Sequence, residues 1–540
     1  MVKQPTKYIF VLGGVLSGLG KGIASASIGY LLKSRGFSVT IMKLDPYLNV
    51  DPGTMNPFQH GEVFVLDDGS ETDLDLGHYE RFTGIEMSAA NNTTTGQIYQ
   101  AVLDRERRGD YLGQTIQVIP HITDEIKRVI KAINIPKKFE IVICEVGGTV
   151  GDIESLPFLE TIRQMRMELG KENCFIAQVT LVPFIKTSGE LKTKPTQHSV
   201  MKLREIGLNP DLLLCRTAYP IPRSVRDKIA LFCNVHPNHV IEAIDVESIY
   251  EVPLVFYNQG VTGIIINQFL LDDTDHDISK LENFVYRVKN PSQRVTISLC
   301  GKYTSLPDSY KSVIEAFTHA AVENDAHVIL HWVDTEDIQS QEDAIQHLSK
   351  ADGILILPGF GSRGIEGKIM CAQFARENRV PCLGICLGLQ CAMIEFARNV
   401  CGLKKANSTE FKKQTPDPII SLMADQKKVK SKGGTMRLGA YPCKLKPGTR
   451  AYAAYRKKMI LERHRHRYEV NNKYQTLFGN HGMIFSGSNP ELNLVEIIEL
   501  KDHPWFVASQ FHPELKSRVE KAHPLFREFV KASIKYRKTK

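Results

Sequence analysis

A cysteine between two glycines lies in the second half of the chain, in the sequence Gly384-Ile385-Cys386-Leu387-Gly388. It follows the apolar run Pro381–Ile385 and precedes a helix-like stretch, Leu389–Arg398. G-x-C-x-G between a strand and a helix is the cysteine form of the nucleophile elbow, a tight turn that exposes a thiol beside a helix N-terminus. The pattern predicts that Cys386 is a nucleophile; the alternative is a buried structural cysteine.

A base for this thiol is predicted near the C-terminus, where His512 and Glu514 stand two residues apart. An imidazole with an orienting carboxylate can move the protons of an acyl transfer. The tetrahedral intermediate also needs backbone N–H donors, and Pro358 has no N–H to give. We therefore expect the N–H groups of Leu387 and Gly359 to form the oxyanion hole.

A second chemical motif is the glycine-rich segment Gly13–Gly22, which follows the apolar run Tyr8–Leu12 and opens a helix-like stretch. Glycine N–H groups can wrap an anion at a helix N-terminus, and Lys21 can reach the outer phosphates. The segment departs from G-x-x-x-x-G-K-[ST], because Gly14 lies one residue too early and Gly22 replaces the hydroxyl residue that contacts magnesium. The motif predicts a phosphate site, with a ligand-free tight turn as the alternative.

If the loop lacks its hydroxyl, carboxylates must hold the metal. Asp75 ends the acidic stretch 67–75, and Glu145 ends the apolar run Glu140–Glu145. Both are candidate magnesium ligands, because ligands gather at the carboxyl ends of parallel strands. The segment 192–198 combines cations, hydroxyls and an amide, which suits a polyphosphate and a base edge; we expect it to be irregular, and a charged surface loop fits its composition equally well.

Apolar runs separated by glycine turns predict the elements that position these residues. Strand, glycine loop, helix and strand in this order predict a βαβ unit of a parallel sheet. The expected strands of the first half are 8–12, 38–43, 140–145, 175–181 and 211–215, with helices at 21–34 and 160–169. The second half begins again with strands at 295–301, 353–357 and 381–385, and the lysine-rich segment 404–432 is expected to be a surface excursion.

The length of 540 residues predicts two domains. The acidic run near 272–277 and the sequence Lys289-Asn290-Pro291-Ser292 mark a connection, so we place domains at 1–270 and 293–540 with a linker at 271–292. A net charge of +8 suits anionic small ligands but is too diffuse for a nucleic-acid groove. Eleven cysteines without disulfide spacing, and no apolar run of about 20 residues, predict a soluble cytoplasmic protein that binds neither nucleic acid nor membrane.

These motifs together resemble the CTP synthase family, over nearly the whole chain. The resemblance extends well beyond the two motifs, to Lys43–Tyr47, His60–Val65, Asp73–Arg81, Gly109–Gly113, Glu145–Phe158, Lys192–Ser199, Gly433–Gly439 and Glu462–Asn472. It implies an α/β fold, with a P-loop-type parallel-sheet synthetase domain followed by a class I glutamine amidotransferase α/β domain. It implies amination of UTP to CTP with ATP, Mg²⁺ and L-glutamine, activation by GTP, feedback inhibition by CTP, and a homotetramer.

The resemblance also implies roles for individual residues. ATP would contact Gly18, Leu19, Gly20, Lys21, Gly22, Ile23, Lys43, Asp75 and Val246, and Mg²⁺ would be held by Asp75 and Glu145. UTP or CTP would contact Ser17, Asp152, Ile153, Glu154, Lys192, Thr193, Lys194, Pro195, Thr196, Gln197 and Lys228. Glutamine would contact Gly359, Leu387, Gly388, Leu389, Gln390, Glu410 and Arg467 around the catalytic residues Cys386, His512 and Glu514, and Arg437 lies in the segment that the family links to GTP.

Two features depart from the family pattern. The family reads P-G-G-F-G where this chain has Leu357-Pro358-Gly359-Phe360-Gly361, so one amide donor is lost, and the stretch before Gly433 is shorter. Two other functions are weighed against this one. Another P-loop amidotransferase, of a cobyric-acid type, would not require a pyrimidine nucleotide. A silent nucleotide-binding scaffold, for which Pro358 is the only support, would not hydrolyse glutamine.

Overall fold

The computed structural model describes residues 5–53, 55, 61–272, 277–302, 304, 306–422 and 436–540. Contacts divide the chain into two units, the first Met1–Thr54 with Thr72–Val285 and the second Met55–Glu71 with Tyr286–Lys540. The segment 55–71 therefore groups with the second unit, which differs from the predicted continuous domain 1–270. His60 and residues 273–276 and 423–435, on which several expectations fall, lie outside the described residues.

Unit 1 is built on a seven-stranded parallel sheet of order β11-β10-β7-β1-β6-β2-β5. The strands are near-continuous apolar runs, as expected for a sheet covered on both faces. Their bounds are β1 Lys7–Gly13, β2 Val39–Asp45, β5 Asn92–Thr94, β6 Ile141–Val146, β7 Cys174–Leu181, β10 Leu212–Thr217 and β11 Val240–Ile244. The five strands predicted for the first half are confirmed to within two residues at either end.

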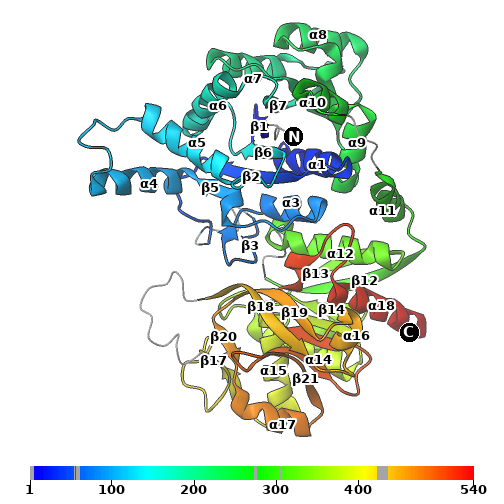
Figure 1. Ribbon diagram of the computed structural model, residues 1–540. Helices are drawn as coiled ribbons and strands as arrows, with labels where there is room; N and C mark the ends of the chain where they lie inside the picture. The colour runs from blue at the N-terminus through cyan, green and yellow to red at the C-terminus, as the bar shows by residue number, and fades with distance from the viewer. Residues whose placement is uncertain are drawn as a thin grey trace. The chain divides into compact units, whose positions relative to one another are not determined.

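Helices cover the two faces of this sheet (Figure 1). Tyr8, Phe10 and Leu12 of β1 pack in one core with apolar residues of α5 (Thr123–Ala132) and α6 (Leu156–Leu169). On the other face, α1 (Lys21–Ser34) approaches Ile41 and Ile143 so closely that a Cβ at Gly29 would lie 2.9 Å from Ile41 Cδ1. Helix α1 has the bounds that the sequence predicts, because the glycine loop sets its start and Arg35-Gly36 follows its end.

The remaining elements of this part of the chain are mostly helical. They are β3 Phe64–Val65, β4 Glu71–Thr72, α3 Asp75–Thr83, α4 Thr95–Arg108, β8 Phe184–Ile185, β9 Glu190–Leu191, α7 Lys194–Glu205, α8 Arg223–Cys233, α9 Val252–Asn258, α10 Val261–Phe269 and α11 Ser279–Lys289. Helix α7 contradicts the expectation that 192–198 is irregular. Pro195 lies in its first turn, where the missing N–H costs no helical hydrogen bond, so the proline starts a helix there.

Unit 2 contains a nine-stranded sheet of order β13-β12-β14-β15-β23-β22-β21-β18-β19. Strands β13 to β23 of this order pair in parallel, and the strands beyond β23 pair antiparallel. The bounds are β12 Gln293–Gly301, β13 Ala326–Asp334, β14 Gly353–Ile356, β15 Cys382–Ile385, β18 Arg437–Leu445, β19 Met459–His466, β21 Met483–Asn489, β22 Leu494–Leu500 and β23 Phe506–Ser509. A three-stranded sheet joins β16 Ala406–Ser408, β17 Asp417–Leu422 and β20 Tyr468–Val470.

Two apolar cores lie on the two faces of the large sheet. One includes residues of α14 and α15, and the other includes residues of α12 and α18. The helices of this unit are α12 Lys311–Glu323, α13 Gln341–Leu348, α14 Ile365–Glu377, α15 Leu387–Asn399, α16 Arg450–Tyr455, α17 Gln475–Asn480 and α18 Pro524–Thr539. Ala406, Ile419 and Ile420 are fully buried in the first core, so the expected surface excursion 404–432 is wrong for these residues.

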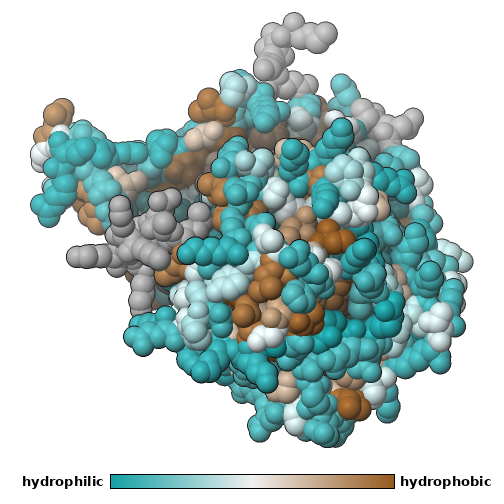
Figure 2. Space-filling view, turned by 90° about the horizontal axis from the view of Figure 1, so that it is seen from below, coloured by the Kyte–Doolittle hydropathy of each residue, from teal (hydrophilic) through white to brown (hydrophobic). Residues whose placement is uncertain are grey.

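The outer surface agrees with a chain that is 42% hydrophobic and keeps most of its apolar residues inside. The face in Figure 2 is largely hydrophilic, with apolar residues gathered in small areas. None of the helices in the described part of the chain is long and apolar enough to cross a membrane. All eleven cysteines are free thiols.

Candidate active sites in the two units

The predicted nucleophile of unit 2 lies in a strained turn. Strand β15 ends at Ile385 and α15 begins at Leu387, which leaves Cys386 between them with φ 52° and ψ −101°. Its N–H donates to the Ser509 carbonyl at 2.7 Å. A Cβ at Gly388 would lie 2.3 Å from the Ile356 carbonyl oxygen, so the glycine permits α15 to start this close to β14. Such strain is typical of nucleophile elbows, and it fixes the thiol at the carboxyl end of the parallel strands.

The predicted base follows the neighbouring strand. Strand β23 pairs with β15, and the chain after it brings His512 to the site, where its N–H donates to the Arg463 carbonyl at 2.8 Å. His512 Nδ1 lies 2.7 Å from Glu514 Oε1, and both residues are buried. Burial alone would lower the pKa of His512, but the Glu514 carboxylate and the Cys386 sulfur raise this pKa to about 10. The three predicted catalytic residues therefore lie together.

The loop Leu357–Gly361, here called the oxyanion loop, lies against the start of α15. A Cβ at Gly359 would lie 3.6 Å from Leu387 Cδ2, which brings the two expected oxyanion donors close together. Glu410 Oε1 accepts the N–H of Gly361 at 2.9 Å. Burial raises the pKa of Glu410, against the opposing effects of the Gly361 N–H, Lys302 and Arg467.

Two glutamines surround the nucleophile, and only one of them was expected. Gln390 Nε2 donates to the Tyr468 carbonyl at 3.2 Å and faces Gln510 Oε1 at 3.4 Å. Gln510 Nε2 in turn lies 3.7 Å from Cys386 Sγ. Gln510 was missed because a glutamine beside an H-P-E sequence carries no pattern of its own. Leu389, which was expected to contact glutamine, has its side chain fully buried in the core, so only its backbone could do so.

Arg437, which lies in the segment that the resemblance links to GTP, begins strand β18 and is buried. Its side chain is buried, and its guanidinium donates to Glu496 at 2.6 Å and to Glu469 at 3.3 Å. It also lies 4.4 Å from the ring centroid of Tyr441. Arg437 is therefore the centre of a buried charge network, and its link to GTP stays a prediction of the resemblance.

In unit 1 the glycine-rich segment forms an open loop after β1. Gly18 and Gly20 have φ of 76° and 90°, which residues with a Cβ rarely adopt, and Ser17 and Gly18 are exposed. Lys21 Nζ donates to the Gly148 carbonyl at 2.8 Å. Burial lowers the pKa of Lys21 against the pull of Glu145 and other nearby carboxylates. The loop thus presents backbone N–H groups and one buried ammonium, as a phosphate site requires.

The two predicted metal ligands meet at Lys43. Lys43 Nζ contacts a carboxylate oxygen of Asp75 and lies 3.0 Å from Glu145 Oε1, and Tyr79 donates to the other oxygen of Glu145. Burial would raise the pKa of Asp75, but Lys43 lowers it; burial and the Asp75 charge raise the pKa of Glu145. A Cβ at Gly22 would lie 2.0 Å from Asp75 Oδ1. The carboxylate therefore fills the space of the hydroxyl residue that the loop lacks.

This pair suits magnesium better than a metal with an all-protein cage. In the part of the chain that the structure describes, no three or more His, Cys, Asp or Glu residues are arranged to hold an ion. Magnesium is usually bound by one or two carboxylates together with substrate phosphates, so Asp75 and Glu145 fit it. The sequence did not single out Asp45 as a residue of this site. Its carboxylate lies 3.9 Å from Lys43 Nζ, and burial raises the pKa of Asp45 to about 8.

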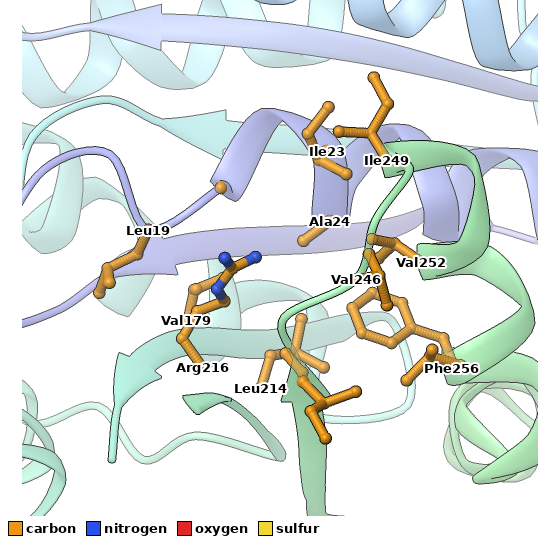
Figure 3. A pocket seen from close by; sticks show the side chains of 14 residues that line it. Leu19, Ile23, Ala24, Val179, Leu214, Arg216, Val246, Ile249, Val252 and Phe256 are labelled. Atoms are coloured by element: carbon orange, nitrogen blue, oxygen red, sulfur yellow. The ribbon is translucent and has the colours of Figure 1, made fainter. Parts of the chain in front are cut away.

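An apolar pocket opens beside the phosphate loop (Figure 3). The expected ATP contacts Leu19, Gly20, Ile23 and Val246 all line it. The side chain of Arg216 lies among apolar side chains there and also pairs with Asp245 at 2.5 Å. The other lining residues, which the sequence did not single out, are Ala24, Val179, Leu214, Ala243, Ile244, Ile249, Val252, Val255 and Phe256. An apolar slot next to a phosphate loop suits the flat base of a nucleotide.

Some of the expected pyrimidine-nucleotide contacts lie around the same loop. A Cβ at Gly148, whose carbonyl binds Lys21, would lie 2.9 Å from Asp152 Oδ2. A Cβ at Gly14 would collide with Ser199 of α7, so the helix that carries Lys194 and Gln197 packs on the loop.

Other members of this set lie differently. Thr196 is buried and its hydroxyl donates to the Leu181 carbonyl at 2.9 Å, so it is engaged inside the protein. Ile153 is 80% exposed, and Glu154 and Lys228 are also exposed. Lys192 pairs with Glu190.

The strained cysteine with its histidine and glutamate, on a partly parallel sheet, defines unit 2 as a glutamine amidotransferase. The family model described as glutamine amidotransferase class-I matches residues 305–532, and the model described as CTP synthase N-terminus matches residues 7–271. The CTP synthase of Carboxydothermus hydrogenoformans is 58% identical over 533 residues, which cover 99% of each chain. That of Cytophaga hutchinsonii is 57% identical over 537 residues, again 99% of each. The chain belongs to the CTP synthase family.

A solved structure is also similar to part of the chain. It is described as Trypanosoma brucei CTPS glutaminase domain with bound acivicin, is 34% identical, and matches 45% of this chain and 94% of its own, with a TM-score of 0.43.

Proposed function

We propose that the chain converts UTP to CTP with ATP, taking the nitrogen from glutamine, through the residues assembled in its two units. The observation that carries the proposal is that one chain holds both a hydrogen-bonded cysteine site and a phosphate loop with a carboxylate in place of its hydroxyl. The first site can release ammonia, and the second can activate an oxygen for displacement by ammonia.

In unit 2, the Cys386 thiolate attacks the side-chain amide carbon of glutamine. The carbonyl oxygen becomes an oxyanion, which the N–H groups of Leu387 and Gly359 stabilise. His512 donates its proton to the leaving nitrogen, so that ammonia departs and a glutamyl thioester remains. Water then attacks the thioester, His512 accepts its proton, and glutamate leaves.

In unit 1, the loop N–H groups and Lys21 bind the ATP phosphates while the base enters the apolar pocket. Asp75 and Glu145 would hold magnesium, which when bound neutralises phosphate charge. Lys43 keeps the two carboxylates together and carries charge next to the transferred group. The uracil 4-oxygen takes the phosphoryl group, because a neutral carbonyl oxygen is a poor leaving group; ammonia adds at that carbon and phosphate leaves.

The remaining ligands are proposed on weaker support. UTP, and CTP as a competing inhibitor, would use Asp152, Lys194 and Gln197 near the loop, together with exposed residues such as Ile153. A homotetramer stays a proposal that rests on the family resemblance. GTP activation stays a proposal of the family resemblance, without support from Arg437. Free cysteines support a reducing, cytoplasmic location.

The test is an absorbance assay of UTP conversion with ATP and magnesium, run with glutamine and separately with ammonium. CTP formation from both nitrogen sources is expected, with a strict requirement for the pyrimidine nucleotide. ATP hydrolysis that does not depend on UTP would favour another P-loop amidotransferase, and absence of glutamine hydrolysis would favour a scaffold.

A further inference from the structure

Two buried lysines donate hydrogen bonds to the backbone carbonyls of the oxyanion loop in unit 2. Lys368 of α14 is fully buried, and its Nζ lies 2.5 Å from the Leu357 carbonyl oxygen and 3.4 Å from that of Pro358. Lys302, which follows β12 and is 2% exposed, donates to the Phe360 carbonyl at 2.7 Å and to the Gly361 carbonyl at 3.0 Å. Four of the five carbonyls of the loop are thus engaged by ammonium groups.

Buried lysines of this kind need a reason. An ammonium group loses much hydration free energy on burial, and proteins normally compensate with a paired carboxylate. Among the residues that the structure describes, neither Lys302 nor Lys368 has a carboxylate within the 4.0 Å of an ion pair. Burial accordingly lowers the pKa of both, that of Lys368 to about 8. A methionine would fill the same space at less cost, so the donors themselves explain the choice of lysine.

The geometry of the peptide bond says what these donors do. In a planar trans peptide the C=O and the next N–H point in opposite directions. When the Pro358 carbonyl turns toward Lys368, the N–H of Gly359 must therefore turn away from it. Gly359 also lies beside Leu387, the residue whose N–H is the other expected donor. Lys302 fixes the following two carbonyls, so the loop cannot rotate this peptide freely.

We propose that Lys368 and Lys302 are positioning residues: they fix the oxyanion loop so that the N–H of Gly359 faces the oxyanion. This inference rests on the proposed glutaminase reaction at Cys386. It also explains why Pro358 is tolerated in the loop, because Lys368 binds its carbonyl and its missing N–H is not one of the proposed donors.

The test compares two probes of Cys386 in the full-length protein. The Cys386 thiolate adds to the aldehyde carbon of L-glutamate γ-semialdehyde and forms a tetrahedral thiohemiacetal. The oxygen on that carbon occupies the oxyanion position. Iodoacetamide alkylates the same thiolate by displacing iodide and forms no oxyanion. We expect inhibition by the semialdehyde to weaken about 100-fold in Lys368→Met and about tenfold in Lys302→Met. The rate of alkylation should stay within about threefold of the wild type, because alkylation needs no oxyanion donor and His512, the cation next to the thiolate, is retained.

Arg376→Met is the matched control, because Arg376 lies on the same helix and pairs with buried Glu395 at 2.7 Å. It should lose stability but keep the response to both probes, and all three variants should keep ammonia-driven CTP formation. Equal loss of semialdehyde binding and alkylation, or unchanged semialdehyde binding in both lysine variants, would overturn the proposal.

Should Lys368→Met fail to fold, Lys302→Met alone tests the proposal, because Lys302 binds the carbonyls of Phe360 and Gly361. If the proposed function itself were wrong, the wild type would neither hydrolyse glutamine nor bind the semialdehyde. Failure of the function and failure of the inference therefore give different results.

Discussion

In unit 2 the nucleophile, base and orienting carboxylate are buried and already within hydrogen-bonding distance of their neighbours, whereas in unit 1 the phosphate loop is open and its carboxylates are occupied by a lysine. The difference follows from the chemistry of each reaction. A covalent nucleophile must be aligned before its substrate arrives, because thiolate attack tolerates little error in geometry. A phosphate site can be completed by its ligand, because ATP supplies the negative charges that the loop binds and its metal supplies the positive charge that the carboxylates bind.

The comparison is tested most strongly by removing the nucleophile. Cys386→Ala should lower glutamine-driven CTP formation by at least about 10⁴-fold, because no other group can form the thioester. Ammonia-driven CTP formation should stay within about threefold of the wild type, since unit 1 keeps all its residues. The measurement is the UTP-to-CTP absorbance assay with each nitrogen source.

Cys391→Ala is the control for this substitution, because Cys391 is a buried core cysteine of α15, the helix that begins directly after Cys386. It should keep both activities. Equal loss of both activities in Cys386→Ala would refute the separation of the two reaction centres.

Substitution of Lys21 should have the opposite effect: loss of CTP formation with glutamine hydrolysis retained. Lys21→Met removes the ammonium that lies at the phosphate loop, so both glutamine-driven and ammonia-driven CTP formation should fall about 10³-fold. Release of glutamate, measured without ATP and UTP, should be unchanged. Lys33→Met at the far end of the same helix removes a lysine that binds the Thr83 carbonyl, and it should leave both activities intact. A loss of ammonia-driven activity smaller than about tenfold would mean that Lys21 does not bind the transferred phosphates.

The preassembled site also makes a prediction about pH. Glu514 and Cys386 raise the pKa of His512 to about 10 against the effect of burial, so His512 keeps its proton at neutral pH and can donate it to the leaving amide nitrogen of glutamine. The stabilisation from this raised pKa is complete below about pH 6.5 and is lost as pH rises through about 10. Glu514→Gln removes the charge that opposes burial, so the pKa of His512 should fall.

We therefore expect glutaminase kcat of Glu514→Gln to drop about 10²-fold and its alkaline limit to move down by more than about one pH unit. The profile is measured from glutamate release between pH 6 and 10. Glu528→Gln, which alters a half-buried ion pair of α18, should leave the profile unchanged. An unmoved alkaline limit in Glu514→Gln would show that Glu514 does not set the protonation of His512.

The unfinished site should depend on its metal. Asp75→Asn removes one charge from the pair that Lys43 joins, so the magnesium concentration for half-maximal ammonia-driven activity should rise at least about tenfold. Asp68→Asn changes an acidic residue of the same predicted stretch that lies outside the site, and it should not shift this concentration. If Asp75→Asn left the magnesium dependence unchanged, Asp75 would not be a ligand.

The sequence predicted those features that are encoded by neighbouring residues. The elbow at Cys386, the pairing of His512 with Glu514 and the loop ahead of Lys21 all follow from short motifs whose backbone geometry is built into their glycines. Contacts between distant segments could not be predicted in this way. Arg463, for example, is fully buried because it pairs with Asp67, which lies 396 positions earlier in the chain.

The same reason explains the residues that were missed or misplaced. Arg216 enters the apolar pocket only because β10 and β11 are neighbours in the sheet. Lys368 looks like an ordinary helical lysine until the fold brings it behind the oxyanion loop. The polar composition of the segment 192–198 predicted irregular structure, although Pro195 in the first turn of α7 is compatible with the start of a helix.

Substitution of Pro358 is expected to have the smallest effect on glutaminase kcat, and it tests which amides of the oxyanion loop act as donors. If the oxyanion needed a second amide from position 358, Pro358→Gly would restore a donor and raise glutaminase kcat about 10²-fold or more. Lys368 donates to the Pro358 carbonyl, and we propose that Gly359 and Leu387 supply the oxyanion donors, so we expect kcat to change by less than about threefold. The free energy of unfolding should fall by about 1 kcal/mol, because glycine has more conformational freedom in the unfolded chain. Glutamate release and thermal unfolding measure the two effects, and a rise in kcat above about tenfold would show that the proline limits the reaction.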